Sequence, residues 1–362
     1  MGTDMYTSSI LKKHAAVYPL MQPTDAVKLI YQETFGGGHM IKSEETALEY
    51  IRCEYAALSH IGEPFRCESL GKVSRVFLDG TLTDTELSLI AKMFCVSARL
   101  YAVGFADASD EVKKKFLARI GILRELCRDG QFGFTPTELD TYLEHCRAAG
   151  YPAVSHSERY RKAYRPAYRV IDSRYVRLIP CIRDIASRLN SSGKRVVVAI
   201  DGKCASGKTT AARLLAGIFD AEVIHMDDFF LPPELRTHER LCEIGGNVHY
   251  ERFESEILPH LRDEFVFNYR VFDCAKRAYS DTPRKIEPSR LIIVEGSYAL
   301  HPRFGDYCDL SVFIDIAPDK QLERIKKRNG EKLLARFQSD WIPMEERYFD
   351  AYNIRENCDF II

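Results

Sequence analysis

A glycine-rich segment in the second half of the chain has the residue types and spacing of a phosphate-binding loop. It reads Gly-Lys-Cys-Ala-Ser-Gly-Lys-Thr from Gly202 to Thr209 and fits G-x-x-x-x-G-K-[ST] without a gap. Glycines let the backbone curl so that successive N–H groups point at phosphate oxygens, and a following helix N-terminus adds partial positive charge. We expect Lys208 to reach the β- and γ-phosphates of ATP and the Thr209 hydroxyl to ligate Mg²⁺. The predicted nucleotide-binding residues are Gly202, Lys203, Cys204, Ala205, Ser206, Gly207, Lys208, Thr209 and Thr210.

Carboxylates follow two short apolar runs elsewhere in this half. Glu295 comes after 291–294, and Asp227 with Asp228 comes after 223–225. Open α/β sheets bind ligands at the carboxyl ends of their strands. Asp227 is therefore a candidate to take the proton from an attacking hydroxyl or to help hold a metal, and Glu295 is a candidate for metal or water contacts. Two structural alternatives stay open: Glu295 caps the next turn, or the aspartates, Asp228 alone included, cap a helix.

The elements around these residues predict an α/β domain. Apolar runs of a few residues alternate with helical stretches, and continuous apolar strands bounded by helices are typical of a parallel sheet covered on both faces. The glycine-rich segment lies between such a strand and an amphipathic helix, as in P-loop NTPase folds. The predicted strands are Val196–Ile200, Val223–His225, Leu291–Val294 and Leu310–Ile316, with helices at Val176–Leu189 and Thr210–Phe219.

The first half is predicted to be mainly helical. Apolar residues recur there at three- and four-residue steps, behind capping residues such as Thr24, Ser43 and Thr83. The expected helices cover about 25–35, 43–58, 84–103, 110–128 and 136–149, and 73–78 predicts one short strand. We place the boundary between Ala153 and Asp172, which gives a helical accessory domain over 1–170, with no role assigned, and an α/β domain over 171–362.

Length and composition agree with two globular domains. The chain has 362 residues, 46% hydrophobic and 28% charged, and its 51 Lys and Arg nearly balance its 52 Asp and Glu. This balance argues against nucleic acid as a partner. No apolar run approaches the ~20 residues of a membrane-spanning helix, and eleven cysteines without a C-x-x-C pair favour neither a disulfide framework nor a zinc site. We expect a cytoplasmic protein with no membrane partner; the oligomeric state, homo-oligomers included, is left open.

Three motifs in the same order resemble the uridine kinase and phosphoribulokinase group of P-loop kinases, over about Val176–Ile362. They are the glycine-rich segment, the D-x-F-[FY] form at Asp227–Phe230, and the pair Glu295-Gly296. The resemblance implies a kinase that transfers the γ-phosphate of ATP, with Mg²⁺, to a hydroxyl of a nucleoside or other small molecule. It implies that Asp227 is the catalytic carboxylate, and that Lys208, Thr209 and Glu295 are phosphate and metal residues.

The same resemblance implies a mobile lid that carries arginines. Arg324, Arg328 and Arg336, between Gln321 and Phe337, are the equivalents in this chain. Planar guanidinium groups suit a migrating phosphoryl group, so Arg324 and Arg328 are taken as catalytic candidates. For any one of them, a solvated basic helix is the alternative.

The acceptor-binding segment departs from the family. Uridine kinases carry P-x-Y-D-F-x-x-H-x-R there, whereas this chain keeps Asp273 but has Arg277 in the place of the histidine. An upstream N-F-D-H-P-like segment is represented only by Asn247-Val248-His249-Tyr250. An extra arginine could favour an acceptor that bears an anion, or Arg277 could be a surface residue. The substrate residues implied by the resemblance are Asp227, Asp273, Arg277, Asn247 and His249.

Other features allow further readings. Arginines and tyrosines alternate over 151–177, which fits either RNA binding or a basic connector between domains. Gly36-Gly37-Gly38-His39 is a turn that could host a ligand. Cys204 could be oxidised to block the nucleotide if its thiol pKa were lowered. The competing function is an ATP-hydrolysing switch in which the N-terminal half senses or binds a partner.

Overall fold

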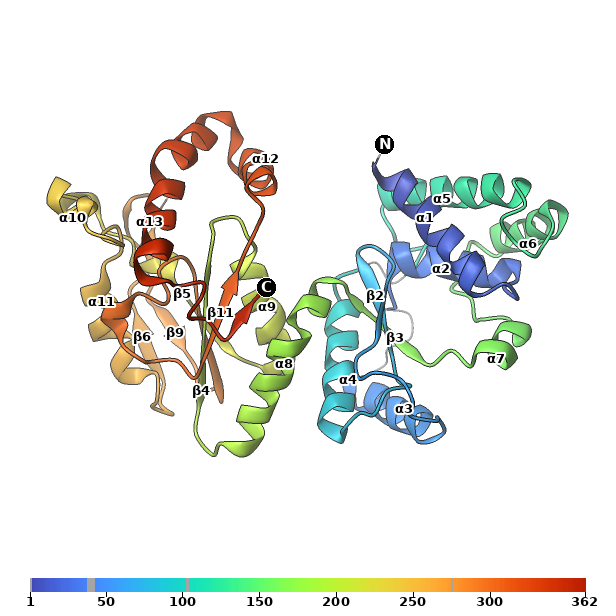
Figure 1. Cartoon of the computed structure of the whole chain (residues 1–362), viewed down its shortest axis with the longest axis horizontal. Helices are drawn as coiled ribbons and strands as arrows, with labels where there is room; N and C mark the ends of the chain where they lie inside the picture. Colours follow the sequence, from blue (N-terminus) through green and yellow to red (C-terminus); the bar gives the residue numbers. More distant parts are fainter. Residues whose placement is uncertain (1, 38–42, 102–103, 275) are drawn as a thin grey trace. The chain divides into compact units, whose positions relative to one another are not determined.

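The computed structural model describes residues 2–37, 43–101, 104–274 and 276–362, which form two compact units, Met1–Arg177 and Leu178–Ile362 (Figure 1). The sequence places the division slightly earlier, after residue 170. Strand β3 (Tyr168–Asp172) lies at that position and pairs with β2 (Val73–Phe77). This pairing keeps β3 in the first unit. Within the described ranges, no helix is both long and apolar enough to cross a bilayer.

The first unit is mainly helical, as predicted. Its helix ends follow local capping chemistry: Ser43 accepts a hydrogen bond from the Thr46 N–H, and Thr83 forms a reciprocal capping box with Glu86. The predicted N-cap Thr24 is wrong, because Pro23 occupies the first helical position and Gln22 caps the helix. The helices are α1 (Gly2–Val17), α2 (Pro23–Phe35), α3 (Glu44–Ala56), α4 (Asp84–Ala98), α5 (Asp110–Arg128), α6 (Pro136–Ala148) and α7 (Glu158–Tyr164). Of the predicted Gly36–His39 turn, residues 38 and 39 lie outside the described ranges.

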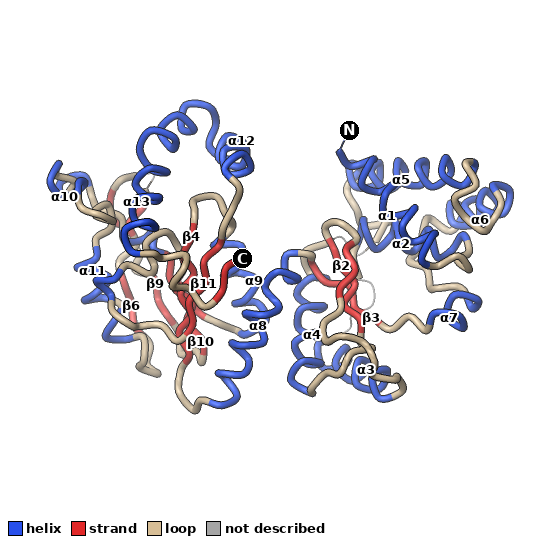
Figure 2. Tube along the Cα trace, in the orientation of Figure 1, coloured by secondary structure: helices blue, strands red, loops and turns tan. Residues whose placement is uncertain are grey.

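A three-stranded antiparallel sheet accompanies these helices, in the order β1 (Cys67–Ser69), β2, β3 (Figure 2). The predicted strand at 73–78 is confirmed as β2, whereas β1 and β3 escaped sequence analysis. Every residue of β2 is buried, including Arg75. Its serine and arginine weaken the apolar alternation from which this strand was predicted.

Polar side chains inside the first unit are bonded to one another. The Arg75 guanidinium donates to the Gln32 side-chain oxygen at 2.8 Å and pairs with Glu68 at 3.2 Å. His156 Nδ1 lies 2.9 Å from an Asp25 oxygen, and its Nε2 lies 2.6 Å from the Tyr168 hydroxyl. Burial lowers the pKa of His156 to about 4, against the opposing effect of its hydrogen bond to Asp25. The ring is thus held neutral in a bonded core position.

Tyrosines of the 151–177 stretch lie in or against the hydrophobic core of the first unit, among them Tyr160, Tyr164 and Tyr168. Tyr160 and Tyr175 are 2% and 0% exposed, and the Tyr160 ring stacks on His156 with centroids 4.3 Å apart. Rings held in this way do not offer their faces to nucleic-acid bases. The Tyr160 and Tyr175 rings are therefore packing residues of the protein interior.

The second unit is built on a parallel sheet with the strand order β12-β11-β4-β10-β5. The predicted parallel α/β fold is confirmed. All residues of β4 and β10 are buried, which explains their continuous apolar sequences. The edge strand β12, two residues long, was not predicted. The strands are β4 (Val196–Gly202), β5 (Glu222–His225), β10 (Leu291–Glu295), β11 (Leu310–Ile314) and β12 (Phe360–Ile361).

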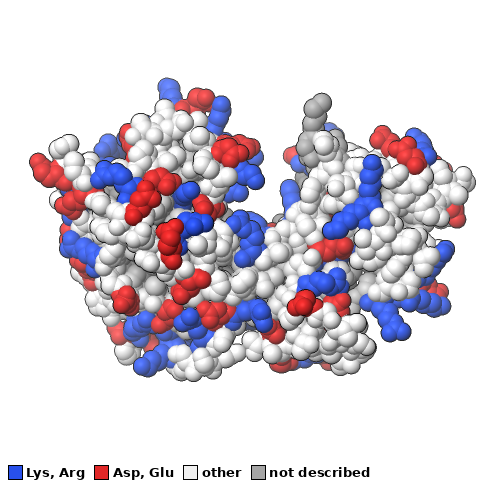
Figure 3. All heavy atoms as spheres, in the orientation of Figure 1, with Lys and Arg blue, Asp and Glu red and all other residues white. Residues whose placement is uncertain are grey.

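Helices cover both faces of this sheet. Helix α9 (Lys208–Phe219) packs on β4, β5 and β10, and on the other face the Phe349 ring of α13 (Ile342–Tyr352) meets Phe313 of β11, with centroids 5.0 Å apart. Lys and Arg side chains are interspersed with Asp and Glu over the visible surface (Figure 3).

The remaining elements are α8 (Arg174–Ser191), η2 (Met226–Phe229), η3 (Pro233–Leu235), α10 (His238–Cys242), α11 (Tyr250–Glu256), η4 (Leu258–His260), β6 (Phe267–Tyr269), β7 (Phe272–Asp273), β8 (Ala278–Tyr279), β9 (Arg284–Ile286), η5 (Pro302–Phe304), α12 (Pro318–Arg336) and η6 (Phe337–Trp341).

Candidate functional site

The glycine-rich segment forms a tight loop from the end of β4 to the start of α9. Gly202 has φ +133°, and a Cβ there would lie 2.2 Å from the Ile314 carbonyl oxygen of the neighbouring strand. Gly207 caps α9 with φ +114° and faces open space. Ala205, between them, also has a positive φ of 58°, a strained conformation for a residue with a side chain. The loop therefore takes the curled form that a phosphate group requires, with room in front of Gly207.

Lys208 lies against this loop. Its Nζ donates to the carbonyl oxygens of Gly202 and Lys203 at 2.6 and 3.0 Å and to the Ser297 hydroxyl at 3.1 Å. The side chain is 9% exposed. These bonds hold a positive charge at the loop, where the γ-phosphate of a nucleotide would need it. Lys203 points elsewhere, with its Nζ 3.2 Å from Asp315.

Glu295 and Thr209 meet at the carboxyl edge of the sheet. Glu295 ends β10 and is 4% exposed, and the Thr209 hydroxyl donates to its Oε2 at 3.2 Å. Its other oxygen, Oε1, bonds His225 Nδ1 at the end of β5, since residues 295 and 225 are register partners. The two predicted metal residues are thus in direct contact. His225 was missed, although its place at the end of a predicted strand could have pointed to it.

Asp227 and Asp228 follow β5 in η2 and have different surroundings. Asp228 is half-buried and accepts a hydrogen bond from the Tyr269 hydroxyl at 2.8 Å. Asp227 as a whole residue is exposed. Desolvation by the surrounding protein raises the pKa of the Asp227 carboxyl group. The negative charges of Glu295 and Asp228 raise it further, while the positive charge of Lys208 lowers it. Asp227 is the better placed of the two to act on a ligand at the loop.

A buried aspartate fixes the start of the loop. Asp201, in β4, accepts hydrogen bonds from the N–H groups of Gly202 and Leu300, at 2.7 and 3.0 Å, and from the Tyr348 hydroxyl at 2.8 Å. Burial raises its pKa to about 6, against these bonds and the charge of Lys208. Sequence analysis ended the strand at Ile200 and overlooked this residue. A carboxylate directly before a glycine-rich loop was the available signal.

Glu345 of α13 reaches the loop from the far end of the chain. Its Oε2 accepts from the Cys204 N–H at 2.8 Å and its Oε1 from the Ser297 hydroxyl at 2.6 Å. Because Ser297 also receives the Lys208 ammonium, these residues connect the loop, the lysine and α13 in one chain of hydrogen bonds. Nothing in the spacing of Glu345 pointed to this role.

The environment of Cys204 suppresses thiolate formation. Its Sγ is 3.2 Å from Gln321 Nε2, and burial together with Glu345 raises the pKa of the thiol to about 12. Oxidation as a control of nucleotide binding needs a lowered pKa. The structure contradicts that condition.

Of the three arginines expected in the lid, Arg324 contacts the loop. One of its guanidinium nitrogens donates to the carbonyl oxygens of Ala205 and Ser206 at 3.2 and 3.0 Å. Arg328, four residues and ~6 Å further along α12, donates to the Asn329 side chain, and Arg336 lies 3.8 Å from Asp340. The structure thus places Arg324 at the loop, whereas the contacts of Arg328 lie along its own helix.

The predicted acceptor residues Asn247 and His249 lie beside the turn that carries Asp227. The His249 N–H donates to the Phe229 carbonyl at 2.6 Å. Asn247 is 7% exposed, and its Oδ1 has no hydrogen-bond partner in the described part of the chain. The His249 ring instead bonds Glu251 at 3.1 Å, which ties it to α11.

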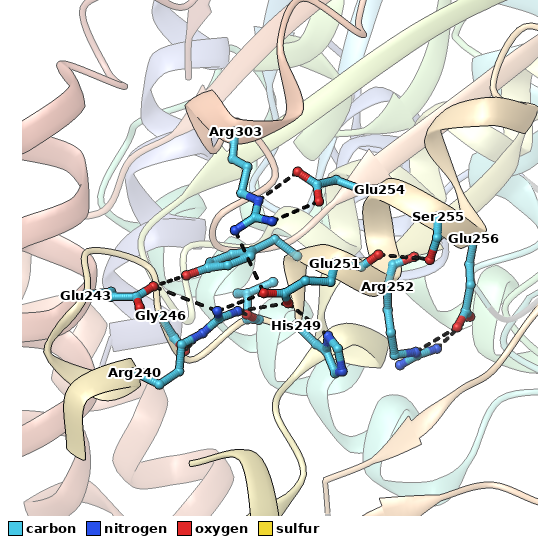
Figure 4. A network of polar contacts seen from close by, with 12 residues as sticks. Arg240, Glu243, Gly246, His249, Glu251, Arg252, Glu254, Ser255, Glu256 and Arg303 are labelled. Carbon is cyan, nitrogen blue, oxygen red and sulfur yellow. Dashed lines mark hydrogen bonds and ion pairs between the residues drawn. The ribbon is translucent and has the colours of Figure 1, made fainter. Parts of the chain in front are cut away.

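An arginine that sequence analysis missed holds this segment in place (Figure 4). Arg240 donates to the carbonyl oxygens of Gly246 and Val248, both at 3.0 Å, and forms a bidentate pair with Glu251 at 2.9 and 3.0 Å. Its guanidinium also covers the Tyr250 ring at 3.6 Å. Arg240 therefore fixes the backbone that presents Asn247.

Asp273 and Arg277 belong to the β7–β8 hairpin, whose tip lies at the same turn. The Cys274 Sγ is 3.7 Å from the Asp227 carbonyl oxygen. Asp273 Oδ1 accepts from the Lys276 N–H at 3.1 Å within the hairpin loop. Arg277 is exposed. The hairpin and the 247–249 segment therefore both border the turn at Asp227.

The residues present fit ATP and Mg²⁺. The Ser206 hydroxyl is buried in the loop without a partner among the described residues, and the amide-lined curl needs an anion. Across the same ranges, no three His, Cys, Asp or Glu side chains enclose a metal site. Mg²⁺ at phosphoryl-transfer sites takes few protein ligands and completes its shell with phosphates and water, so a Thr209–Glu295 pair is adequate.

The solved structures to which this chain is similar include two described as kinases. A protein provisionally described as a fructose transport system kinase, from Silicibacter sp. TM1040, shares 24% identity, with a TM-score of 0.45. One described as a possible uridine kinase, from Bacillus stearothermophilus, shares 19% identity, with a TM-score of 0.38. Each match covers 51% of this chain and 98% of the other. No family model and no curated protein matches the chain.

Proposed function

We propose that the second unit is an ATP-dependent phosphotransferase that moves the γ-phosphoryl group to a hydroxyl of a nucleoside or other small molecule. One observation carries the proposal. The carboxyl edge of a single parallel sheet brings Lys208 in the phosphate loop, the Thr209–Glu295 pair and the carboxylate of Asp227 together. A phosphate-binding loop alone would serve hydrolysis equally well. A carboxylate with a raised pKa, such as that of Asp227, suits deprotonation of an acceptor hydroxyl.

In this proposal each group of the site has a distinct role in phosphoryl transfer. The loop N–H groups and Lys208 bind the phosphates and offset the charge that develops on the transferring group. Thr209 and Glu295 would hold Mg²⁺, which neutralises phosphate charge when bound. Asp227 accepts the proton of the acceptor hydroxyl and orients its oxygen toward the γ-phosphorus. Arg324, already at the loop, would add a guanidinium on the remaining side.

The test is transfer of label from [γ-³²P]ATP to a panel of nucleosides, sugars and other small alcohols, with products identified by mass spectrometry. The Lys208→Ala variant should lose at least about a hundredfold in rate, because it removes the charge at the transferring group. Lys194→Ala removes an exposed lysine of the same unit and is the control. ATP hydrolysis without any labelled acceptor, or full transfer by Lys208→Ala, would overturn the proposal.

A further inference from the structure

His225 and Glu295 end two neighbouring strands of the parallel sheet, and their side chains bond each other there. The two residues are register partners of β5 and β10, and His225 Nδ1 bonds Glu295 Oε1. The contact joins segments 70 residues apart, at the edge of the sheet where the Thr209 hydroxyl also meets Glu295. The proposed function gives this histidine no role of its own.

The backbone is tightly packed directly beyond this pair. Gly296 has φ +141°, and a Cβ there would lie 2.6 Å from the Cβ of Met226, closer than unbonded carbon atoms approach. A glycine is therefore required for the chain after β10 to lie against the chain after β5. This close approach, together with the strand pairing, holds the His225 and Glu295 side chains next to each other.

Both oxygens of the Glu295 carboxylate have a partner. Oε2 accepts from the Thr209 hydroxyl at 3.2 Å, and Oε1 bonds His225. An ionised carboxylate only accepts hydrogen bonds, so Nδ1 carries the proton in this contact. Because Glu295 is buried, an oxygen left without a donor would be unfavourable. Two donors, one from α9 and one from β5, therefore hold the carboxylate in one orientation.

The imidazole ring itself is a poor ligand for the cation in the proposed function. Mg²⁺ takes oxygen ligands, whereas imidazole suits transition metals. The ring nitrogen that faces Glu295 is also occupied by the hydrogen bond. Groups that hydrogen-bond a metal-ligating carboxylate nevertheless change metal affinity by about 10- to 100-fold, because they orient the ligand. Any effect of His225 on a metal ion therefore passes through Glu295.

We propose that His225 is a positioning residue, whose Nδ1–H holds the Glu295 carboxylate beside Thr209 and thereby maintains the affinity of the nucleotide site for Mg²⁺. The inference rests on the proposed phosphotransferase function and adds a residue to its metal site. In this role His225 touches neither the nucleotide nor the acceptor. The loop N–H groups and Lys208 bind the phosphates without it, so nucleotide binding in the absence of metal does not depend on His225.

Substitutions that keep or remove the donor test this role. The side-chain nitrogen of asparagine is attached to Cγ, as Nδ1 is in histidine, so His225→Asn keeps a donor at this place. His225→Gln carries its nitrogen one bond further out, and His225→Leu has no donor. His260→Asn is the matched control: this partly exposed histidine lies at the opposite edge of the sheet, where Arg195, just before β4, donates to its carbonyl oxygen at 3.3 Å.

Two binding measurements on the full chain separate the metal from the nucleotide. The Kd of Mn²⁺, a paramagnetic substitute for Mg²⁺, is measured by electron paramagnetic resonance with a non-hydrolysable ATP analogue bound. The Kd of the same analogue is measured by calorimetry in EDTA. His225→Leu and His225→Gln should weaken Mn²⁺ binding by about 10- to 100-fold. Their metal-free nucleotide affinity should stay close to that of the wild type, and His225→Asn and His260→Asn should keep both affinities.

The outcomes separate this inference from the proposed function. Wild-type affinity for Mn²⁺ in His225→Leu and His225→Gln overturns the positioning role and leaves the phosphotransferase standing. Equal losses in His225→Asn and His225→Gln also overturn it, and this pair suffices if His225→Leu does not fold. Parallel loss of metal-free nucleotide binding overturns it in favour of a purely structural role. Mn²⁺ binding that depends on the donor, without transfer to any acceptor, supports the positioning role and refutes the phosphotransferase.

Discussion

The carboxylate of Glu345 accepts a hydrogen bond from the Cys204 N–H at 2.8 Å, across a sequence separation of 141 residues. The same carboxylate receives the Ser297 hydroxyl at 2.6 Å, and Ser297 in turn receives Lys208 Nζ. The phosphate loop is therefore attached to α13, which follows α12 and η6 along the chain.

Truncation of Glu345 should loosen the phosphate loop. Glu345→Ala leaves the Cys204 N–H and the Ser297 hydroxyl without their acceptor, at a cost of about 1–3 kcal/mol in unfolding free energy. We expect the Kd for ATP to rise about tenfold, measured by calorimetry, because the loop would no longer be held in its binding form. Glu356→Ala, an exposed change near the same helix, is the control. Unchanged ATP affinity in Glu345→Ala would show that the loop keeps its form without this attachment.

Cys204 should react slowly with alkylating agents. Only the thiolate is nucleophilic, and at pH 8 a thiol with a pKa of about 12 supplies a very small fraction of it. Iodoacetamide labelling followed by mass spectrometry should modify the exposed Cys53 and Cys242 well before Cys204. Glu345→Gln removes the negative charge beside the sulfur and should speed labelling of Cys204. Equal rates at Cys204 and Cys242 in the wild type would contradict this account of the site.

Replacement of Asp227 should separate chemistry from nucleotide binding. Asp227→Asn cannot accept a proton, so kcat should fall by about 10²- to 10⁴-fold while ATP affinity stays close to that of the wild type. A base must be deprotonated to act, so transfer should fall as the pH drops through the raised pKa of Asp227, and the variant should lack this acidic limb. Asp228→Asn, which keeps an oxygen for Tyr269, is the matched control. A full acidic limb in Asp227→Asn would assign it to another group.

The parts of the site that could be predicted are those set by short-range sequence. Gly202, Gly207, Lys208 and Thr209 lie within one loop, and backbone conformation alone requires the glycines. Glu295 and Asp227 were predicted because parallel strands align their carboxyl ends at one edge. Their positions follow from the sheet and need no knowledge of distant contacts.

The missed residues are those that act across the chain. Glu345 and Arg240 are charged groups whose partners are set by tertiary packing, and nothing in their local sequence distinguishes them from ordinary surface residues. Strand β3 was missed for a related reason, since its buried pairing with β2 includes arginines on both strands. Helical periodicity in the first unit gave helix positions but not the polar core that joins them.

The polar core of the first unit should make that unit acid-sensitive. His156 has a pKa of about 4 in the folded protein, lowered by burial, against about 6.5 in an unfolded chain. Between these values the unfolded chain binds more protons, so the free energy of unfolding falls as the pH drops from about 6.5 to 4, with a slope approaching ~1.4 kcal/mol per pH unit. The lowered pKa of Asp25 acts only below its ordinary value of 3.8, outside this window.

Tryptophan fluorescence would report on the second unit, because the single tryptophan, Trp341, belongs to it. The measurement is therefore amide hydrogen exchange of α2 peptides, corrected for intrinsic exchange rates. His156→Gln should flatten the pH dependence of their protection, whereas His145→Gln, an exposed change in α6, should retain it; an equal slope in His156→Gln and the wild type would place the acid sensitivity elsewhere.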